Sequence, residues 1–152
     1  QHFLKGCMMS KIYLAYGSNM SVEQMAHRCP EAKLLEVSVL PGFRLAFTGA
    51  PNRSYATIQK DDTRQVPVLL WEISQTDEAS LDRYEDYPNF YEKAEIELNG
   101  QTVMYYYMVK QYGLGLPSEE YYNIIAAAYD KFDFDKTILE RALKESQNVI
   151  KS

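Results

Sequence analysis

Residues Tyr91 to Val109, YEKAEIELNGQTVMYYYMV, contain two strand-like runs on either side of Asn99-Gly100. Asn-Gly is the strongest short signal for a β-hairpin, because both central positions of a type I′ turn need positive φ. The sequence therefore predicts strands over Tyr91–Leu98 and Gln101–Val109 that pair antiparallel through this turn.

Short strand-like runs also precede the hairpin. Lys11 to Tyr16 alternates apolar and polar residues and stops at Gly17-Ser18-Asn19, which is typical of a strand that ends in a turn. Pro41-Gly42 and Asp61-Asp62 are predicted turns within the next stretch. The predicted strands there are Leu34 to Leu40, Arg44 to Thr48, Tyr55 to Lys60 and Val66 to Ile73.

Helix signals occur in four places. Ser21 is a predicted N-cap of a short helix that ends by Cys29, because Pro30 disfavours helical geometry in the residue before it. A second helix covers Ser74 to Tyr84, with Ser74 or Thr76 as its cap. Two more are predicted from residues 117–120 onward, with Tyr121, Ile124, Ile125 and Ala128 facing inward, and over Thr137 to Asn148. Clustered strands with inserted or appended helices favour an α+β domain with a mostly antiparallel sheet.

Length and composition indicate one globular domain. The chain has 152 residues, of which 46% are hydrophobic and 24% charged, so it can bury a sizeable core. Residues 1–8 are interpreted as a leader, since Met8 and Met9 are both possible natural starts, and residues 9–152 as the single domain. Thirteen tyrosines against one tryptophan indicate many half-buried positions, where a ring packs while its hydroxyl finds a polar partner.

Charge and hydropathy restrict the partners. Sixteen basic against twenty-one acidic residues give a net charge of −5, which argues against nucleic acid. Apolar runs such as Val66 to Trp71 are too short to span a membrane, so we expect a soluble, cytoplasmic protein with no membrane partner. Cys7 and Cys29 are too few for a disulfide framework or a cysteine metal site. No pattern bears on the oligomeric state.

The sequence lacks the residues that several common catalytic mechanisms and binding sites require. His27 is the one histidine outside the leader, and no G-x-S-x-G turn accompanies it, so a Ser-His-Asp mechanism is not supported. No His or Cys pairs have metal-ligand spacing, and the aspartates at 130, 133 and 135 lack the glycine and terminal glutamate of a calcium loop. A P-loop and G-x-G-x-x-G are also missing. We therefore predict neither a metal nor a cofactor.

Two segments are candidates for chemistry. The successive N–H groups of Tyr16-Gly17-Ser18-Asn19 can form an anion site at a strand-to-helix turn, although small residues there are also ordinary turn chemistry. Helical spacing puts Glu85 on the same face as Leu81 and Tyr84, with Asp82 and Asp86 pointing elsewhere. Glu85 is then either a rim carboxylate or a partly buried one whose pKa is raised, as a general acid/base needs.

In combination these segments resemble a known family, the gamma-glutamylcyclotransferase-like (AIG2-like) proteins. The resemblance runs from about Lys11 to about Asp135. It is carried, in this order, by Ala15-Tyr16-Gly17-Ser18-Asn19-Met20, Phe47-Thr48-Gly49, Tyr55-Ala56-Thr57-Ile58, Leu81-Asp82-Arg83-Tyr84-Glu85, Tyr87-Pro88, Tyr91, Pro117-Ser118 and Tyr121.

What the resemblance implies is a small, mostly antiparallel β-barrel flanked by helices, with no cofactor. It also implies an enzyme that cyclises a small-molecule gamma-glutamyl amide or peptide to 5-oxoproline and releases an amine or amino acid. Glu85 matches the family's catalytic glutamate. The substrate-binding residues implied are Tyr16, Gly17, Ser18 and Asn19 of the loop, and Tyr91 near the pocket.

Three departures from the family pattern bear on substrate choice. Asp86 stands where a glycine is usual and is expected to raise the pKa of Glu85 or crowd the pocket. Ser54-Tyr55 replaces a glycine-rich stretch and is expected to narrow the mouth, and Ala127-Ala128 replaces another glycine. The alternatives are a non-catalytic ligand-binding module on the same fold, or an interaction domain that works through a tyrosine-rich surface.

Overall fold

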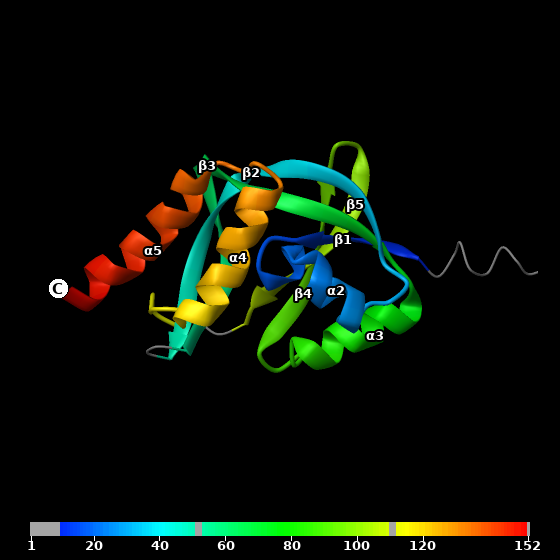
Figure 1. Ribbon diagram of the computed structural model, residues 1–152, viewed down its shortest axis with the longest axis horizontal. Coiled ribbons are helices and arrows are strands. Elements are labelled where there is room, and N and C mark those ends of the chain that lie inside the picture. The colour runs from blue at the N-terminus through cyan, green and yellow to red at the C-terminus, as the bar shows by residue number, and fades with distance from the viewer. Residues whose placement is uncertain (1–9, 51–52, 110–111, 152) are drawn as a thin grey trace, which may run out of the picture.

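The protein is built on one five-stranded sheet with helices at its ends and over one face (Figure 1). The computed structural model describes residues 10–50, 53–109 and 112–151, so the predicted leader and Cys7 lie outside the described residues. The strands are β1 (Lys11–Ala15), β2 (Lys33–Ala50), β3 (Arg53–Ile73), β4 (Tyr91–Leu98) and β5 (Gln101–Met108).

The sheet has the order β2-β3-β1-β5-β4. All neighbouring strands are antiparallel except β1 and β5, which are parallel, and this confirms the predicted α+β class and mostly antiparallel sheet. In the described residues the edge strands β2 and β4 do not pair, so the predicted barrel is only a loose description of an open sheet. Side chains connect the turn between β4 and β5 to the other edge strand, β2. The amide of Asn99 donates to Glu36 Oε2 at 3.0 Å and to Ser38 Oγ at 3.1 Å.

The predicted hairpin is confirmed. Tyr91 pairs with Met108 and Leu98 with Gln101, and the two turn residues have φ of 53° at Asn99 and 80° at Gly100. Both values lie in the left-handed region, which asparagine and glycine tolerate better than other residues.

The region between Leu34 and Ile73 differs from the prediction. Four short strands were expected, but β2 and β3 are long strands that continue through Pro41-Gly42 and Asp61-Asp62. Instead of a turn, Pro41-Gly42 forms an irregularity in the β2–β3 pairing, where Gly42 has φ of 84°. A bulge of this kind bends a strand without ending it.

The helices begin where the sequence predicts. They are α2 (Val22–Arg28), α3 (Gln75–Tyr84), α4 (Glu119–Lys131) and α5 (Lys136–Lys151). Ser21, Ser74 and Ser118 cap the first three, and Ser74 forms a reciprocal capping box with Asp77. A short 3-10 helix, η1 (Ser18–Met20), was not predicted.

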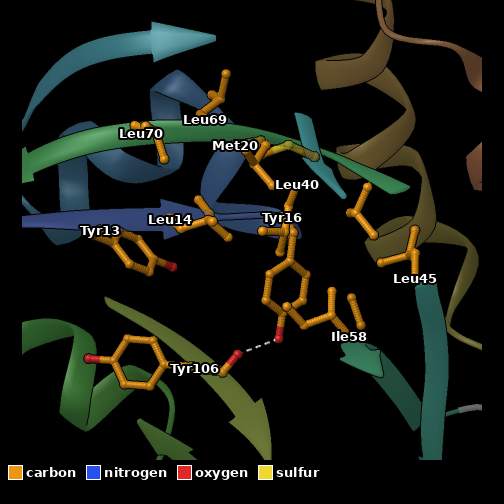
Figure 2. Packing of buried hydrophobic residues seen from close by; sticks show 14 of the residues in the cluster. Tyr13, Leu14, Tyr16, Met20, Leu40, Leu45, Ile58, Leu69, Leu70 and Tyr106 are labelled. Carbon is orange, nitrogen blue, oxygen red and sulfur yellow. Dashed lines mark hydrogen bonds between the residues drawn. The ribbon is translucent and has the colours of Figure 1, made fainter. Parts of the chain in front are cut away.

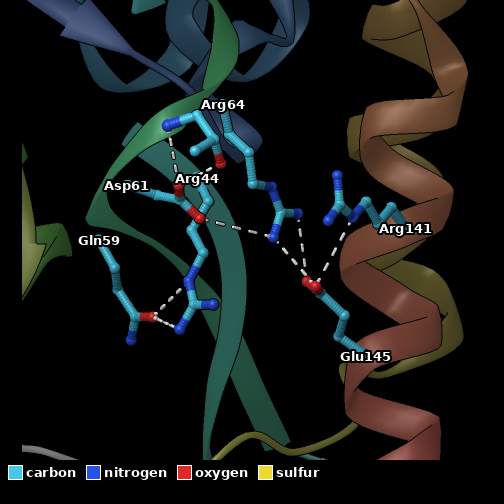
Figure 3. A network of polar contacts seen from close by, with 7 residues as sticks. Arg44, Gln59, Asp61, Arg64, Arg141 and Glu145 are labelled. Atoms are coloured by element: carbon cyan, nitrogen blue, oxygen red, sulfur yellow. Dashed lines mark hydrogen bonds and ion pairs between the residues drawn. The ribbon is translucent and has the colours of Figure 1, made fainter. Parts of the chain in front are cut away.

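Buried side chains of the core pack against both faces of the central strand β1. Tyr13 and Leu14 point to opposite faces and are both buried, as Figure 2 shows among the surrounding aliphatic and aromatic residues. Helix α5 is held against the sheet by Arg64 of β3, whose guanidinium binds the Glu145 carboxylate at 3.0 and 3.2 Å (Figure 3). Among the described residues, no helix is both long and apolar enough to cross a membrane.

Candidate active site

The six predicted site residues all line one cavity of about 260 Å³. It lies where the end of β1, the end of α3, the start of β4 and the first turn of α4 meet. The predicted residues are Tyr16, Gly17, Ser18, Asn19, Glu85 and Tyr91, and the other lining residues are Tyr13, Tyr55, Ala56, Tyr84, Phe90, Tyr106 and Tyr121.

The loop after β1 presents free backbone donors. Met20 N–H donates to Gly17 O and Ser21 N–H to Ser18 O, both at 3.0 Å, which tightens the chain into η1. The N–H groups of Gly17, Ser18 and Asn19 have no acceptor among the described residues. Successive unpaired N–H groups in a tight turn form a concave site for an anion.

The side chain of Asn19 is not available to a ligand. Its amide nitrogen donates to the Tyr13 hydroxyl at 2.9 Å, and its amide oxygen accepts from Arg28 Nη1. Arg28 in turn stacks on Tyr84, with its guanidinium carbon 3.5 Å from the ring centroid. Asn19 therefore offers the cavity its backbone N–H, while its side chain fixes the shape of the loop.

Glu85 follows the last residue of α3. Its N–H donates to Leu81 O at 2.8 Å, so the turn that carries Glu85 continues the helix. No hydrogen bond or ion pair from a described residue reaches its carboxylate. Burial raises the pKa of Glu85 to about 7, against a smaller opposing effect of the positive charge of Arg28. A carboxyl group with such a pKa is available at neutral pH both as an acid and as a base.

The expected effect of Asp86 is wrong. Asp86 is exposed and does not line the cavity, and the pKa of Glu85 is raised by burial rather than by the neighbouring charge. Asp86 has φ of 52°, a left-handed conformation that glycine adopts without strain. The usual glycine of the family pattern is therefore explained by the backbone at this position.

The neighbouring carboxylate of Asp82 is already paired. It accepts from the Tyr106 hydroxyl at 2.6 Å and from Lys93 Nζ at 3.1 Å, and Lys93 also binds Glu78 at 2.8 Å. Glu85 is thus the one carboxylate among the described residues lining the cavity.

Buried tyrosine hydroxyls form the rest of the polar wall. Tyr16 donates to the Tyr106 carbonyl at 2.6 Å (Figure 2), and Tyr91 donates to the Ala56 carbonyl at 2.7 Å. Burial, reinforced by the nearby charge of Glu85, raises the pKa of both hydroxyls well above the ordinary value, so they stay protonated. The two predicted tyrosines therefore contribute mainly their rings to the cavity.

Tyr121 was not among the predicted site residues. Its hydroxyl accepts from Ala56 N–H at 3.1 Å, so its own proton is free to be donated. The same oxygen lies beside Gly17, at 3.4 Å from where a β-carbon would stand. The signal for this placement was Ser118, which caps α4 and puts Tyr121 in its first turn.

Among the described residues, no three His, Cys, Asp or Glu side chains are grouped as a metal site would need. Of the Ser54-Tyr55 pair, Tyr55 lines the cavity and is 36% exposed, whereas Ser54 is buried and does not line it, and the expected narrowing of the mouth stays a prediction.

The chain belongs to the family described as gamma-glutamyl cyclotransferase, AIG2-like, whose profile matches residues 13–129. It is similar to the solved structure of a gamma-glutamyl cyclotransferase, with 25% identity, a TM-score of 0.75, and coverage of 88% of this chain and 86% of the other. An uncharacterized protein from Homo sapiens has the same identity and TM-score, with coverage of 95% and 99%. YkqA from Bacillus subtilis shares the fold at 18% identity and a TM-score of 0.73, over 91% of this chain and 54% of that one. A search of curated proteins finds no match.

Proposed function

We propose that this protein is a gamma-glutamyl cyclotransferase that converts a small gamma-glutamyl amide or peptide into 5-oxoproline and a free amine or amino acid, with Glu85 as acid and base. The observation that carries the proposal is the Glu85 carboxylate, with its pKa raised by burial to about 7, in the same cavity as three N–H groups, all four without a partner among the described residues. Family membership supports the same class of reaction.

The proposed reaction joins two ends of one molecule. The α-nitrogen of the gamma-glutamyl group attacks its own γ-carbonyl carbon, a five-membered lactam closes, and the bond from that carbon to the leaving nitrogen breaks. Two protons leave the attacking ammonium and two are gained by the departing amine, so no net proton is released. Glu85 takes a proton from the ammonium and delivers one to the leaving nitrogen.

Positioning supplies much of the rate in such a reaction. Well-oriented intramolecular reactions gain up to roughly 7–11 kcal/mol over their bimolecular counterparts. The enzyme then has to hold the folded conformer of the substrate and manage protons, and neither task requires a metal or a cofactor. The N–H groups of Gly17, Ser18 and Asn19 are suited to hold either the substrate α-carboxylate or the developing oxyanion. The Tyr121 hydroxyl adds a fourth donor at this loop.

The test is an assay for 5-oxoproline over a panel of gamma-glutamyl compounds. The panel contains gamma-glutamyl amino acids, a polyamine conjugate and an ε-lysine conjugate. Glu85→Gln should keep the fold, checked by circular dichroism, and lose at least roughly a hundredfold in turnover. Asp86→Asn, which neutralises the exposed neighbouring carboxylate, should keep substantial activity. Full activity of Glu85→Gln, or an inactive Asp86→Asn beside an active Glu85→Gln, would contradict the proposal.

A second experiment addresses the loop. 5-Oxoproline added to the labelled protein should first perturb the amide NMR signals of Gly17, Ser18 and Asn19. Gly17→Pro removes a donor and should weaken binding, whereas Ser18→Ala keeps the backbone and should be milder. Signals that shift only elsewhere, with binding unaffected in a folded Gly17→Pro variant, would make the loop a structural turn.

A further inference from the structure

The cavity is poor in charge and rich in aromatic rings. Eight of its thirteen described lining residues are tyrosine or phenylalanine, and Glu85 is the one carboxylate among them. No lysine, arginine or histidine is among the described lining residues. If Glu85 moves the protons, the described lining residues hold no second carboxylate for a leaving group with a distal ammonium.

Exposure of the rings distinguishes the inner end of the cavity from its mouth. Tyr13, Tyr16 and Tyr106 are buried, whereas Tyr55 is 36% and Tyr84 45% exposed. Tyr16 belongs to the loop that is proposed to hold the gamma-glutamyl group, and the Tyr13 hydroxyl accepts from Asn19 of that loop at 2.9 Å, while the Tyr84 hydroxyl reaches the loop's outer side, 3.3 Å from Ser18 Oγ. The mouth is therefore where the departing amine extends.

The two sides of the mouth differ in how their rings are covered. The ring of Tyr84 is already covered by Arg28, whose positive charge also opposes a cation nearby. On the other side Tyr55 meets Phe90 edge-to-face at 6.0 Å and Tyr121 at 5.2 Å, with interplanar angles of 89° and 87°. Those contacts hold the Tyr55 ring in place while part of it faces solvent.

We infer that Tyr55 and Phe90 form the subsite for the leaving amine, and that this subsite takes an aromatic amine uncharged beyond its departing nitrogen, in preference to a polyamine. The inference rests on the proposed cyclotransferase function. An aromatic ligand ring can stack against this wall and gains area burial and edge-to-face contact. A distal ammonium at the same wall gains only a cation–π contact with a partly exposed ring and loses part of its water, whereas a ligand ring also buries apolar area.

The inference is tested by comparing gamma-glutamyl phenethylamide, butylamide and putrescine monoamide conjugates by kcat/KM. The phenethylamide should exceed the putrescine conjugate by roughly tenfold. Tyr55→Ala should reduce that ratio by about three- to tenfold, mostly through KM, and leave the butylamide much less affected. Tyr112→Ala is the matched control, because Tyr112 is 37% exposed and lies 6.1 Å from Phe90 but does not line the cavity. Its ratio should equal that of the wild type.

The outcomes separate this inference from the proposed function. Release of 5-oxoproline with a preference for the putrescine conjugate, or with an unchanged ratio in Tyr55→Ala, would overturn the subsite and leave the cyclotransferase standing. If no conjugate is cyclised, the proposed cyclotransferase function is wrong. The subsite is then tested by the dissociation constants of the intact conjugates, comparing the phenethylamide with the putrescine conjugate in the wild type and in Tyr55→Ala. If Tyr55→Ala does not fold, product inhibition of the wild type decides, since phenethylamine should inhibit more strongly than putrescine.

Discussion

Replacing Glu85 by glutamine should stabilise the protein at neutral and higher pH while it abolishes turnover. Burial raises the pKa of Glu85 from the ordinary value of 4.5 to about 7. At about 1.4 kcal/mol for each pH unit by which the pKa moves, ionising this carboxyl group in the folded protein costs about 3 kcal/mol more than in the unfolded chain. Because the cavity opens to solvent, this figure is an upper limit.

The direction in which stability changes with pH follows from how many protons the folded and unfolded states bind. Between pH 4.5 and about 7 the folded protein keeps the Glu85 proton that the unfolded chain has lost, so stability falls as pH rises through this window. Glutamine does not titrate and escapes the loss. The gain in the free energy of unfolding from Glu85→Gln should therefore be small at about pH 4 and approach its full value at about pH 8.

Urea unfolding of both proteins at the two pH values measures this difference. Glu78→Gln is the matched control on the same helix, because its salt bridges to Lys93 and Lys11 hold the pKa of Glu78 below its usual value despite partial burial. Glu78→Gln should destabilise the protein at pH values above the pKa that Glu78 has in the unfolded chain. The loss should shrink as the pH falls through the lower pKa that Glu78 has in the folded protein. A Glu85→Gln effect that is independent of pH would refute the reasoning about burial.

Four further outcomes are expected. Arg28→Gln should raise the pKa of Glu85 further and move the acid limb of the pH–rate profile upward, whereas Arg28→Lys should move it less, as pH profiles or a carboxyl NMR titration will show. Asp86→Gly should raise the urea midpoint, since it removes left-handed strain of up to about 1 kcal/mol. Ser74→Ala should cost about 1 kcal/mol of stability by calorimetry through the lost cap, with turnover unchanged. Dialysis against a strong chelator should leave the rate of 5-oxoproline release unchanged.

Local signals in the sequence were sufficient for the hairpin and the helix starts. Asn99-Gly100 determines its turn through backbone conformation alone, and Ser21 and Ser118 cap their helices through contacts three residues away. Pro41-Gly42 shows where local signals fail. Its turn chemistry is overridden because both flanking segments pair with the same strand, β3, and the chain bends through a bulge.

The site was predictable only in part for a similar reason. The loop and Glu85 were candidates from turn chemistry and helical spacing, and a family resemblance supplied their roles, while the contacts of individual side chains depend on partners distant in sequence. The Ser118 cap indicates where Tyr121 lies in α4, but not that its hydroxyl reaches Ala56, 65 residues away. The side chain of Asn19 is withdrawn from the cavity by Tyr13 and Arg28, which the loop motif by itself does not reveal.

The most direct test of the central claim, internal cyclisation that depends on Glu85, is to run the reaction in water enriched in oxygen-18. Cyclisation forms 5-oxoproline without water as a nucleophile, so the product should carry no label and appear in equal amount with the free amine, and Glu85→Gln should form almost none. Glutamate that carries the label would show that water attacks the amide, and unlabelled 5-oxoproline formed as fast by Glu85→Gln would show that this carboxylate is not the acid and base.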